Sequence, residues 1–301
     1  MEDVNLIAFN FGYGSFTNGP GISCWNFAKF CKNNFLIYTK LKSDVKNFNI
    51  NSIKNFKTNN TSVLHWWSGL TDEFLSLALR EKSNGKKIVI GPNLFDGTNP
   101  ALEIEISRKL NPDLILTVNK EIKYNLKKYL NYRIEEFMTG PDYDLWCPKK
   151  NINNKVLWKG NPSHQSKDIT LALEVSKKLV DKIDLMGYPS TYKYMDHVDP
   201  AASYAVYVIT SLSETKSEAV LEQMAAGVPV VAHPKVYMMG SHYKTGIVVG
   251  RDAESISAAA NKILDDKELR LDLSLGARQF VLDNFKKETL NEYYNWLINE
   301  C

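Results

Sequence analysis

Long apolar runs are missing from this 301-residue sequence, and none approaches the roughly 18 residues that a membrane-spanning helix needs. Cysteine is scarce as well: Cys24, Cys31, Cys147 and Cys301 form no C-x-x-C pair. This spacing argues against a zinc site and against a framework of disulfide bonds. The first residues are acidic and lead directly into a strand, which argues against a signal peptide. We therefore expect a cytoplasmic protein with reduced thiols.

A strong charge of either sign is also missing. Residues 1–150 contain 20 Lys and Arg against 15 Asp and Glu, and the remainder contains 17 against 19. This mild excess allows a weak contact between the basic N-terminal half and a membrane surface, but it does not argue for one. The basic stretch 120–133 is typical of a solvated helix face, with a membrane or nucleic-acid contact as the alternative. The length allows two domains of about 150 residues each.

The most informative stretch lies in the second half of the chain. Residues 204–210 form an apolar segment that predicts a strand, and residues 228–232 predict another. Thr215 and Glu218 have the spacing of a capping box, which predicts the start of a helix between the two strands. Such a unit belongs to a parallel sheet. Its polar loop, 211–217, leaves the carboxyl end of the first strand, where open α/β sheets bind ligands.

Two acids flank this predicted helix start. Glu214 precedes the helix and Glu222 lies inside it. A carboxylate accepts hydrogen bonds from a pair of sugar hydroxyls, and the N-terminus of a helix suits a phosphate. The pattern therefore fits a nucleotide-sugar. The spacing alone also fits a loop charge and a solvated helix residue, so both interpretations stay open at this point.

The segment SETKSEAVLEQMAAGVPVVA resembles the E-x7-E signature of retaining GT-B glycosyltransferases of the family 4 type, also called glycosyl transferases group 1. The two acids, Gly227, Pro229 and the Val-Val-Ala end agree in register. The resemblance implies that Glu214 contacts the donor sugar and that Glu222 contacts the ribose of the nucleotide. Residues 216–218 depart from the aromatic and small residues usual there, which leaves the donor sugar open.

A second match concerns the cations that hold the donor diphosphate. In the family, a Gly-Arg pair is followed after five residues by a lysine. Here Gly160 and Asn161 stand at the pair and Lys167 stands at the lysine, so the arginine is absent. The resemblance implies that Lys167 stabilises the leaving phosphate, with weaker donor binding, an unusual donor or compensation by Lys216. We expect Glu214 and Lys167 to be catalytic and the following residues to bind the donor: Gly21, Gly160, Asn161, Thr215, Lys216, Ser217 and Glu222.

The first half of the chain carries weaker signals. A glycine-containing loop, 12–21, lies between a predicted strand and a helix predicted for 22–32. Its end, 18–21, resembles a family loop near the donor phosphate and the acceptor, with a plain turn as the alternative. His65 and Asn93 end two further predicted strands, and both are candidates for the acceptor side. For His65, a packed and hydrogen-bonded core histidine is the alternative.

Segment 137–150 resembles the family's linker between domains. It contains Asp142 and Asp144, formally the D-x-D pattern that holds a divalent metal on the donor diphosphate. We reject that interpretation because the pair lies within the linker match. No metal and no other cofactor is therefore expected.

The fold class predicted is α/β, with the GT-B architecture: two doubly wound Rossmann-like domains, 1–150 and 151–285, facing a cleft. The terminal helix, 286–301, is expected to cross back to the first domain. The function implied by the resemblance is a retaining, metal-independent glycosyltransferase with a UDP- or GDP-sugar as donor. A glycan, a lipid, a protein and a modified nucleic acid all remain open as acceptors, and the oligomeric state is not predicted.

Two other functions fit the same sequence. A non-catalytic sugar-nucleotide-binding or scaffold protein is supported by Asn161 and Asn93, which replace an arginine and a histidine of the family pattern. The presence of Glu214, Glu222 and Lys167 opposes it. A GT-B-like sugar-nucleotide epimerase is the other alternative, and donor turnover without an acceptor would favour it.

Overall fold

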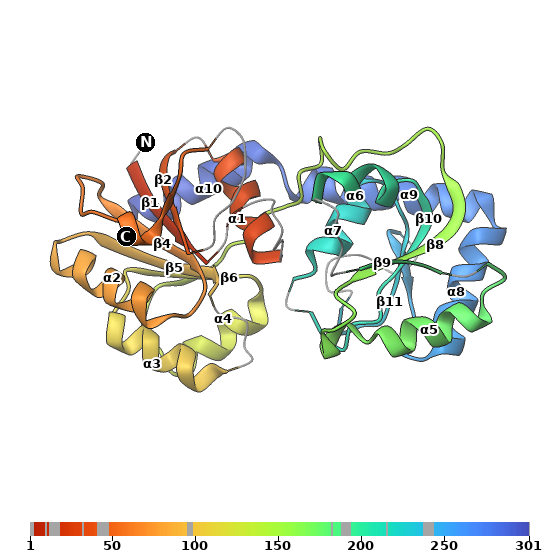
Figure 1. Ribbon diagram of the computed structural model, residues 1–301, viewed down its shortest axis with the longest axis horizontal. Coiled ribbons are helices and arrows are strands. Elements are labelled where there is room, and N and C mark those ends of the chain that lie inside the picture. Colours follow the sequence, from red (N-terminus) through yellow and green to blue (C-terminus); the bar gives the residue numbers. More distant parts are fainter. Residues whose placement is uncertain are drawn as a thin grey trace. The chain divides into compact units, whose positions relative to one another are not determined.

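The computed structural model describes residues 3–9, 11, 19–31, 33–40, 48–94, 99–181, 183–187, 194–214, 216–236 and 244–300. The chain divides into two compact units. The first consists of Met1–Thr139 with Lys287–Cys301, and the second of Gly140–Lys286. Each unit is built on a parallel sheet (Figure 1).

The first unit has a seven-stranded sheet in the order β3-β2-β1-β4-β5-β6-β7. Its strands are β1 (Asp3–Ala8), β2 (Asn34–Thr39), β3 (Ile50–Ser52), β4 (Val63–Ser68), β5 (Lys87–Asn93), β6 (Leu114–Thr117) and β7 (Ile134–Glu136). Its helices are α1 (Gly19–Phe30), α2 (Asp72–Ser83), α3 (Pro100–Leu110), α4 (Lys120–Lys127) and α10 (Lys287–Asn299). Helical crossovers are the connection that parallel strands require.

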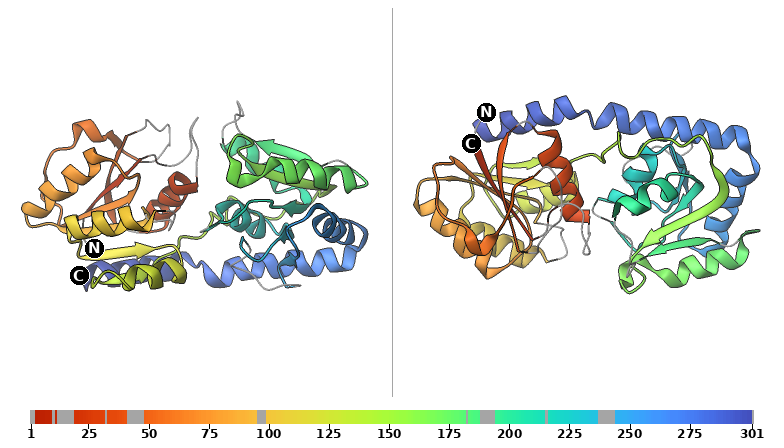
Figure 2. Two further views of the ribbon diagram at one scale, coloured as in Figure 1. Left: turned by 90° about the horizontal axis from the view of Figure 1, so that it is seen from below. Right: turned by 45° about the horizontal axis from the view of Figure 1, so that its top comes forward.

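Helices cover both faces of this sheet because its strands are apolar on both sides. Leu64 and Trp66 of β4 share one core with α2, α3 and α4. Val63 and Trp67, which alternate with them, share the other core with α1 and α10. The last helix of the chain therefore belongs to the first unit; in Figure 2 it is the blue helix beside the label C.

The second unit has a five-stranded sheet in the order β12-β11-β10-β8-β9. Its strands are β8 (Asn153–Gly160), β9 (Asp184–Gly187), β10 (Tyr204–Val208), β11 (Val230–Ala232) and β12 (Gly246–Val248). Its helices are α5 (Ile169–Lys178), α6 (Tyr194–Ala201), α7 (Glu218–Ala225), α8 (Ala253–Asp265) and α9 (Lys267–Asn284). Helices α5 and α8 share a core with the sheet, and α7 packs against α9 and β11.

One arginine ties the segment after Thr139 to the second unit. A guanidinium nitrogen of Arg278, on α9, lies 2.8 Å from the carbonyl oxygen of Tyr143, 2.9 Å from that of Trp146 and 2.6 Å from that of Ala225. Ala225 ends α7, where carbonyls lack partners within the helix. The division between the units therefore falls before Gly140 rather than near residue 150.

Several element bounds differ from those predicted. Helix α1 begins at Gly19 rather than near residue 22, so Gly21 lies in its first turn and not in the preceding loop. Helix α7 begins at Glu218, and its N-cap is Ser217, whose hydroxyl accepts from the N–H of Val220 at 3.4 Å. Thr215, the cap predicted from the sequence, and residues 12–18 lie outside the described residues.

A close backbone approach in the second unit requires glycine. A Cβ placed on Gly276 of α9 would lie 1.7 Å from the carbonyl oxygen of Lys244. We expect Gly276→Ala to lower the free energy of unfolding by about 3 kcal/mol, because α9 or the turn before β12 must shift. Urea denaturation measures this. The control is Leu275→Ala, at the exposed neighbouring position, which should change stability by less than about 0.5 kcal/mol. Equal losses in both variants would refute the explanation by close backbone approach.

Candidate functional site

The predicted donor residues of the second unit follow two neighbouring strands. β8 and β10 pair in parallel, with Trp158 opposite Val208, so the loops that follow them leave the same edge of the sheet. The loop after β8 leads through a short 3-10 turn, Gln165–Lys167, into α5. The loop after β10 leads into α7. This edge is the usual ligand-binding edge of an open parallel sheet.

Hydrogen bonds fix the two loops against each other. The hydroxyl of Thr210 lies 2.8 Å from the carbonyl oxygen of Lys167, and it accepts from the indole N–H of Trp158 at 2.9 Å. The N–H of Leu212 donates to the carbonyl oxygen of Ser166 at 2.8 Å. Since Thr210 and Trp158 are buried, their bonds hold the backbone of Lys167 in place relative to the loop that carries Glu214.

The residue after Lys167 contributes to the same anchor. Asp168 adopts the left-handed conformation, with φ 48°, and caps α5 by accepting from the N–H of Leu171 at 3.1 Å. Its other carboxylate oxygen accepts from the guanidinium of Arg251. Arg251 also donates to the carbonyl oxygen of Thr210 at 3.3 Å. Asp168 therefore ties the turn that presents Lys167 to the start of α5 and, through Arg251, to Thr210 in the loop after β10.

Two acid–lysine pairs form at this edge. The ammonium of Lys167 lies 2.5 Å from Oε1 of Glu214, and the ammonium of Lys159 lies 2.7 Å from Oε2 of Glu222. Glu222 is only 2% exposed, so its charge depends on Lys159 and other polar neighbours. Burial, and then the charges of Glu214 and Glu222, raise the pKa of Tyr207 on β10. The structure thus brings both predicted acids and Lys167 together.

The remaining predicted residues of this edge have structural tasks. Lys216, proposed from the sequence as a compensating cation, is only 2% exposed and pairs with Glu218 at 2.5 Å. Its burial argues against a direct contact with the donor. Asn161 accepts from the N–H of Ser163 at 3.0 Å, which closes a turn of the Asx type. A Cβ on Gly160 would lie 3.0 Å from the ring of Trp158 and 3.6 Å from Cβ of Lys167, so glycine lets these neighbours pack closely.

Lys159 joins the predicted acids at this edge, although the sequence motifs do not predict it. The family pattern begins at Gly160, and a lysine one position earlier carries no signal by itself. Its only signal in the sequence is that a basic residue stands two positions before Asn161, which lacks the charge of the family's arginine. The contact with Glu222, far away in the sequence, identifies Lys159 in the structure.

The acceptor-side candidates lie in the first unit. His65 is completely buried, with Nδ1 2.9 Å from the hydroxyl of Tyr294 and Nε2 2.7 Å from the carbonyl oxygen of Gly91. Burial lowers the pKa of His65 to about 4, against the opposing effect of the Gly91 carbonyl, so the ring is neutral at pH 7. This geometry favours the core interpretation. Asn93 ends β5, and its buried side-chain oxygen has no hydrogen-bond partner among the described residues.

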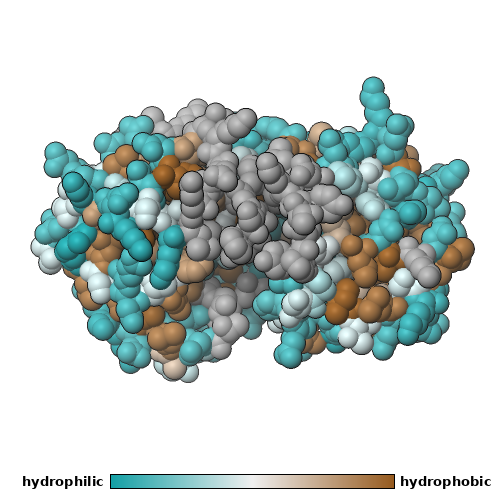
Figure 3. Space-filling model, in the orientation of Figure 1, coloured by the Kyte–Doolittle hydropathy of each residue, from teal (hydrophilic) through white to brown (hydrophobic). Residues whose placement is uncertain are grey.

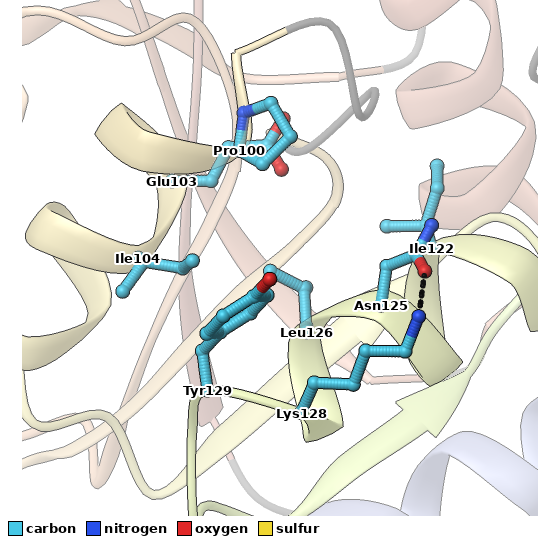
Figure 4. Close-up of a pocket in the computed structure, with 8 residues that line it drawn as sticks. All are labelled: Pro100, Glu103, Ile104, Ile122, Asn125, Leu126, Lys128 and Tyr129. Atoms are coloured by element: carbon cyan, nitrogen blue, oxygen red, sulfur yellow. Dashed lines mark hydrogen bonds between the residues drawn. The ribbon is translucent and has the colours of Figure 1, made fainter.

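The first unit also contains a small hollow between α3 and α4 (Figure 4). Ile104, Ile122 and Leu126 give it an apolar lining, and Tyr129 and Lys128 stand at its side. None of the predicted site residues lines it.

No helix in the described ranges is both long and apolar enough to cross a bilayer. On the face shown in Figure 3, hydrophobic residues are mixed with many hydrophilic ones.

Groups of three metal-ligating side chains do not occur among the residues that the structure describes. The D-x-D aspartates do not share an environment: Asp142 is buried, whereas Asp144 is exposed. Gly21 is buried within α1.

Comparisons with known proteins place these observations in a family. The sequence profile described as "Glycosyl transferases group 1" matches residues 105–280. This range includes both acid–lysine pairs. A comparison with curated protein sequences found no significant match.

Solved structures of several glycosyltransferases are similar in fold. HepE from Anabaena, crystallised with UDP-glucose, matches with a TM-score of 0.79 and 10% identity over 100% of both chains. Sucrose-phosphate synthase from Thermosynechococcus elongatus matches with a TM-score of 0.78 and 13% identity over 100% of this chain and 99% of that one. A glycosyltransferase from Rickettsia africae has a TM-score of 0.73 and 13% identity, with 99% and 98% covered.

At these identities the structural likeness shows the fold, which is GT-B. The family follows from the sequence profile, because it spans more than half of the chain. Together, profile and fold agree with the parallel sheets and with the E-x7-E acids at the edge of the second sheet. The chain belongs to the glycosyl transferases group 1 family, and it is a glycosyltransferase with the GT-B fold.

Proposed function

We propose that this glycosyltransferase transfers a sugar from a UDP-sugar to an acceptor hydroxyl, with retention of configuration and without a bound metal. The observation that carries the proposal is the pairing of Lys167 with Glu214 beside that of Lys159 with Glu222, on loops held together by Thr210. The UDP-glucose bound to HepE supports a uridine nucleotide, and a GDP-sugar is the alternative.

Each residue has a task in this scheme. Glu222 accepts hydrogen bonds from the ribose hydroxyls, and Glu214 does so from the donor sugar. Lys167 donates to the diphosphate, whose negative charge grows as the bond between the anomeric carbon and the phosphate oxygen breaks. The acceptor oxygen bonds to the anomeric carbon, and its proton passes to the departing phosphate. Lys167 leaves its partner Glu214 for the phosphate, or holds both, since an ammonium has three donors.

This distribution of charge supports the proposal that no metal is needed. Lysine supplies the positive charge at the leaving group that a divalent ion supplies in other transferases. Calorimetric titration of the protein with UDP, GDP and ADP, in buffer with EDTA, tests both nucleotide binding and metal independence. We expect binding of one nucleotide, unchanged by EDTA, and an accompanying thermal stabilisation of about 2.7 kcal/mol at a ligand concentration 100 times the Kd.

The same titration on Glu222→Ala tests the assignment of the ribose site. Binding should weaken at least about tenfold, because the ribose loses a charged hydrogen-bond partner. Glu254→Ala is a control on the same unit, since that acid is exposed on α8 and pairs with Lys178. Failure of every nucleotide to bind the wild type would contradict the proposal. Binding that disappears with EDTA would contradict metal independence.

A non-catalytic nucleotide-sugar-binding protein is the second candidate. It is favoured by Asn161, which closes a turn instead of presenting a cation. Hydrolysis of the UDP-sugar discriminates the enzyme from the binding protein. A glycosyltransferase site transfers the sugar slowly to water when no acceptor is present. Release of UDP from UDP-sugar that depends on Lys167 would support the enzyme. Binding without any release would favour the second candidate.

A further inference from the structure

The pair of Lys159 and Glu222 joins a cation to the proposed ribose-binding acid. Lys159 is the penultimate residue of β8, and its ammonium lies 2.7 Å from Oε2 of Glu222. The same ammonium lies 4.7 Å from the ring centroid of Trp146, which is fully buried. The side chain of Lys159 is 16% exposed, so a ligand at this edge can reach it. Glu222 and Trp146 thus hold a cation whose end borders the site.

Lys159 lies close in the chain to the position of the missing arginine. It is the penultimate residue of β8, which ends at Gly160, and position 161 begins the turn that follows. Asn161 has no charge, and its side-chain oxygen serves that turn. At this end of β8 the positive charge therefore comes from Lys159.

Two other cations near these loops, Lys216 and Arg251, have partners outside the proposed ligand contacts. Lys216 is buried with Glu218, and Arg251 is bound by Asp168, the cap of α5. Lys159, like Lys167, is instead paired with an acid that is proposed to bind the donor. The ribose and the diphosphate of a nucleotide are joined through one carbon and one oxygen. A ribose held by Glu222 therefore brings the first phosphate close to Lys159.

We propose that Lys159 is a donor-binding residue whose ammonium contacts Glu222 and the donor diphosphate together, and so replaces the cation that position 161 lacks. This inference rests on the proposed nucleotide-sugar site. An ammonium can donate to a carboxylate and to a phosphate oxygen at once.

Titrations of Lys159→Met with UDP and with uridine, by calorimetry and NMR respectively, test the proposal. We expect the affinity for UDP to fall at least about tenfold, as for a lost charge-assisted hydrogen bond, and that for uridine to fall less than about threefold. Lys155→Met is the matched control, since Lys155 lies on the same strand, is half exposed and pairs with Asp184. Its affinity for UDP should equal that of the wild type. Equal losses for UDP and uridine in Lys159→Met would show that Lys159 acts only through Glu222, and would overturn the proposal.

Asn161→Arg provides a test that does not depend on the folding of Lys159→Met. In the wild-type background the added arginine should tighten UDP binding less than about threefold, because Lys159 already supplies the charge. In the Lys159→Met background it should recover most of the lost affinity. Tightening of about tenfold or more in the wild-type background would overturn the proposal. Absence of any UDP or GDP binding to the wild type would instead refute the proposed function, so the two failures are distinguishable.

Discussion

Replacing Lys167 with methionine is expected to lower kcat by about 100-fold or more, while the donor still binds. The ammonium of Lys167 lies 2.5 Å from Glu214, on a turn fixed by Thr210 and Asp168. A fixed cation stabilises charge that develops on the leaving phosphate, and removal of one such donor typically costs about 100- to 1,000-fold in rate. The measurement is the release of UDP from the UDP-sugar, with and without acceptor. Methionine keeps an unbranched side chain, one atom shorter than that of lysine, and removes the ammonium with its charge and its hydrogen-bond donors.

The control for this variant is Lys178→Met. Lys178 lies at the end of α5 in the same unit and pairs with Glu254 at 2.5 Å, but both side chains are largely exposed. Exposed ion pairs contribute little to stability, so this variant should keep the wild-type kcat and melting temperature. An effect of Lys167→Met on KM alone, with kcat unchanged, would contradict a role at the leaving group and would leave Lys167 as a binding residue.

Local sequence was sufficient to predict where the two acids and Lys167 lie in the fold, whereas their roles in binding and catalysis stay predictions. Glu214, Glu222 and Lys167 lie within short segments whose spacing is bound to strand–loop–helix units. Parallel pairing of β8 and β10 then brings the two segments to one edge. Lys159 could not be predicted in the same way, because its meaning depends on Glu222 and Trp146, which approach it only in the folded unit.

His65 illustrates the opposite case, in which a residue with a suggestive position proves to be buried. The end of a parallel strand is a common place for ligand-binding residues. Here the hydroxyl of Tyr294, on the last helix of the chain, occupies one ring nitrogen, and the carbonyl of Gly91 occupies the other. Neither contact follows from the sequence around residue 65. Burial could be decided only once α10 was placed against the first sheet.

Element bounds were hardest to predict where two signals compete. Thr215 and Ser217 are both suitable N-caps, and α7 begins after the second. Helix α3 is absent from the predicted elements although Asn99 caps it and Pro100 stands at its first position, a combination that indicates a helix start. Strand β3 lies in an Asn-rich, polar stretch without alternation, so tertiary pairing with β2 decides its conformation.

The largest effect on stability is expected from Lys86→Met in the first unit. The ammonium of Lys86 lies 3.0 Å from Oε2 of Glu81, and both side chains are buried. The hydroxyl of Thr58 donates to the other oxygen of Glu81 at 2.7 Å, and Lys86 donates to Asn59 and Thr61. Removing Lys86 leaves the buried Glu81 with Thr58 and the exposed Arg80, whose Nε lies 3.3 Å from Oε1, as its remaining partners. Since the buried cation is lost, we expect the free energy of unfolding at pH 7 to fall by about 3–5 kcal/mol.

The pH dependence identifies the cause of this loss. Burial by itself raises the pKa of Glu81, but the hydrogen bonds from Thr58 and Lys86 and the charge of Lys86 outweigh it, so the pKa lies below its usual value. A depressed pKa contributes stability that is present above the pKa of the unfolded chain and is lost as the pH falls through the folded pKa. In Lys86→Met the part of this contribution that Lys86 supplies is lost, while the hydrogen bonds from Thr58 and Arg80 remain. The difference between wild type and variant in urea denaturation should therefore shrink below about pH 4.

The double variant Lys86→Met/Glu81→Gln separates charge from packing. Because it removes both charges, it should be more stable at pH 7 than Lys86→Met alone. The difference in stability between the double variant and the wild type should again shrink in acid, because the wild type then loses the contribution of its ionised Glu81. A loss that is the same in both variants would mean that the stem of Lys86, and not its pairing with Glu81, stabilises this end of the sheet. Because Glu81 lies on α2 and Lys86 lies directly before β5, recovery in the double variant would show that the buried pair fixes the helix against the strand.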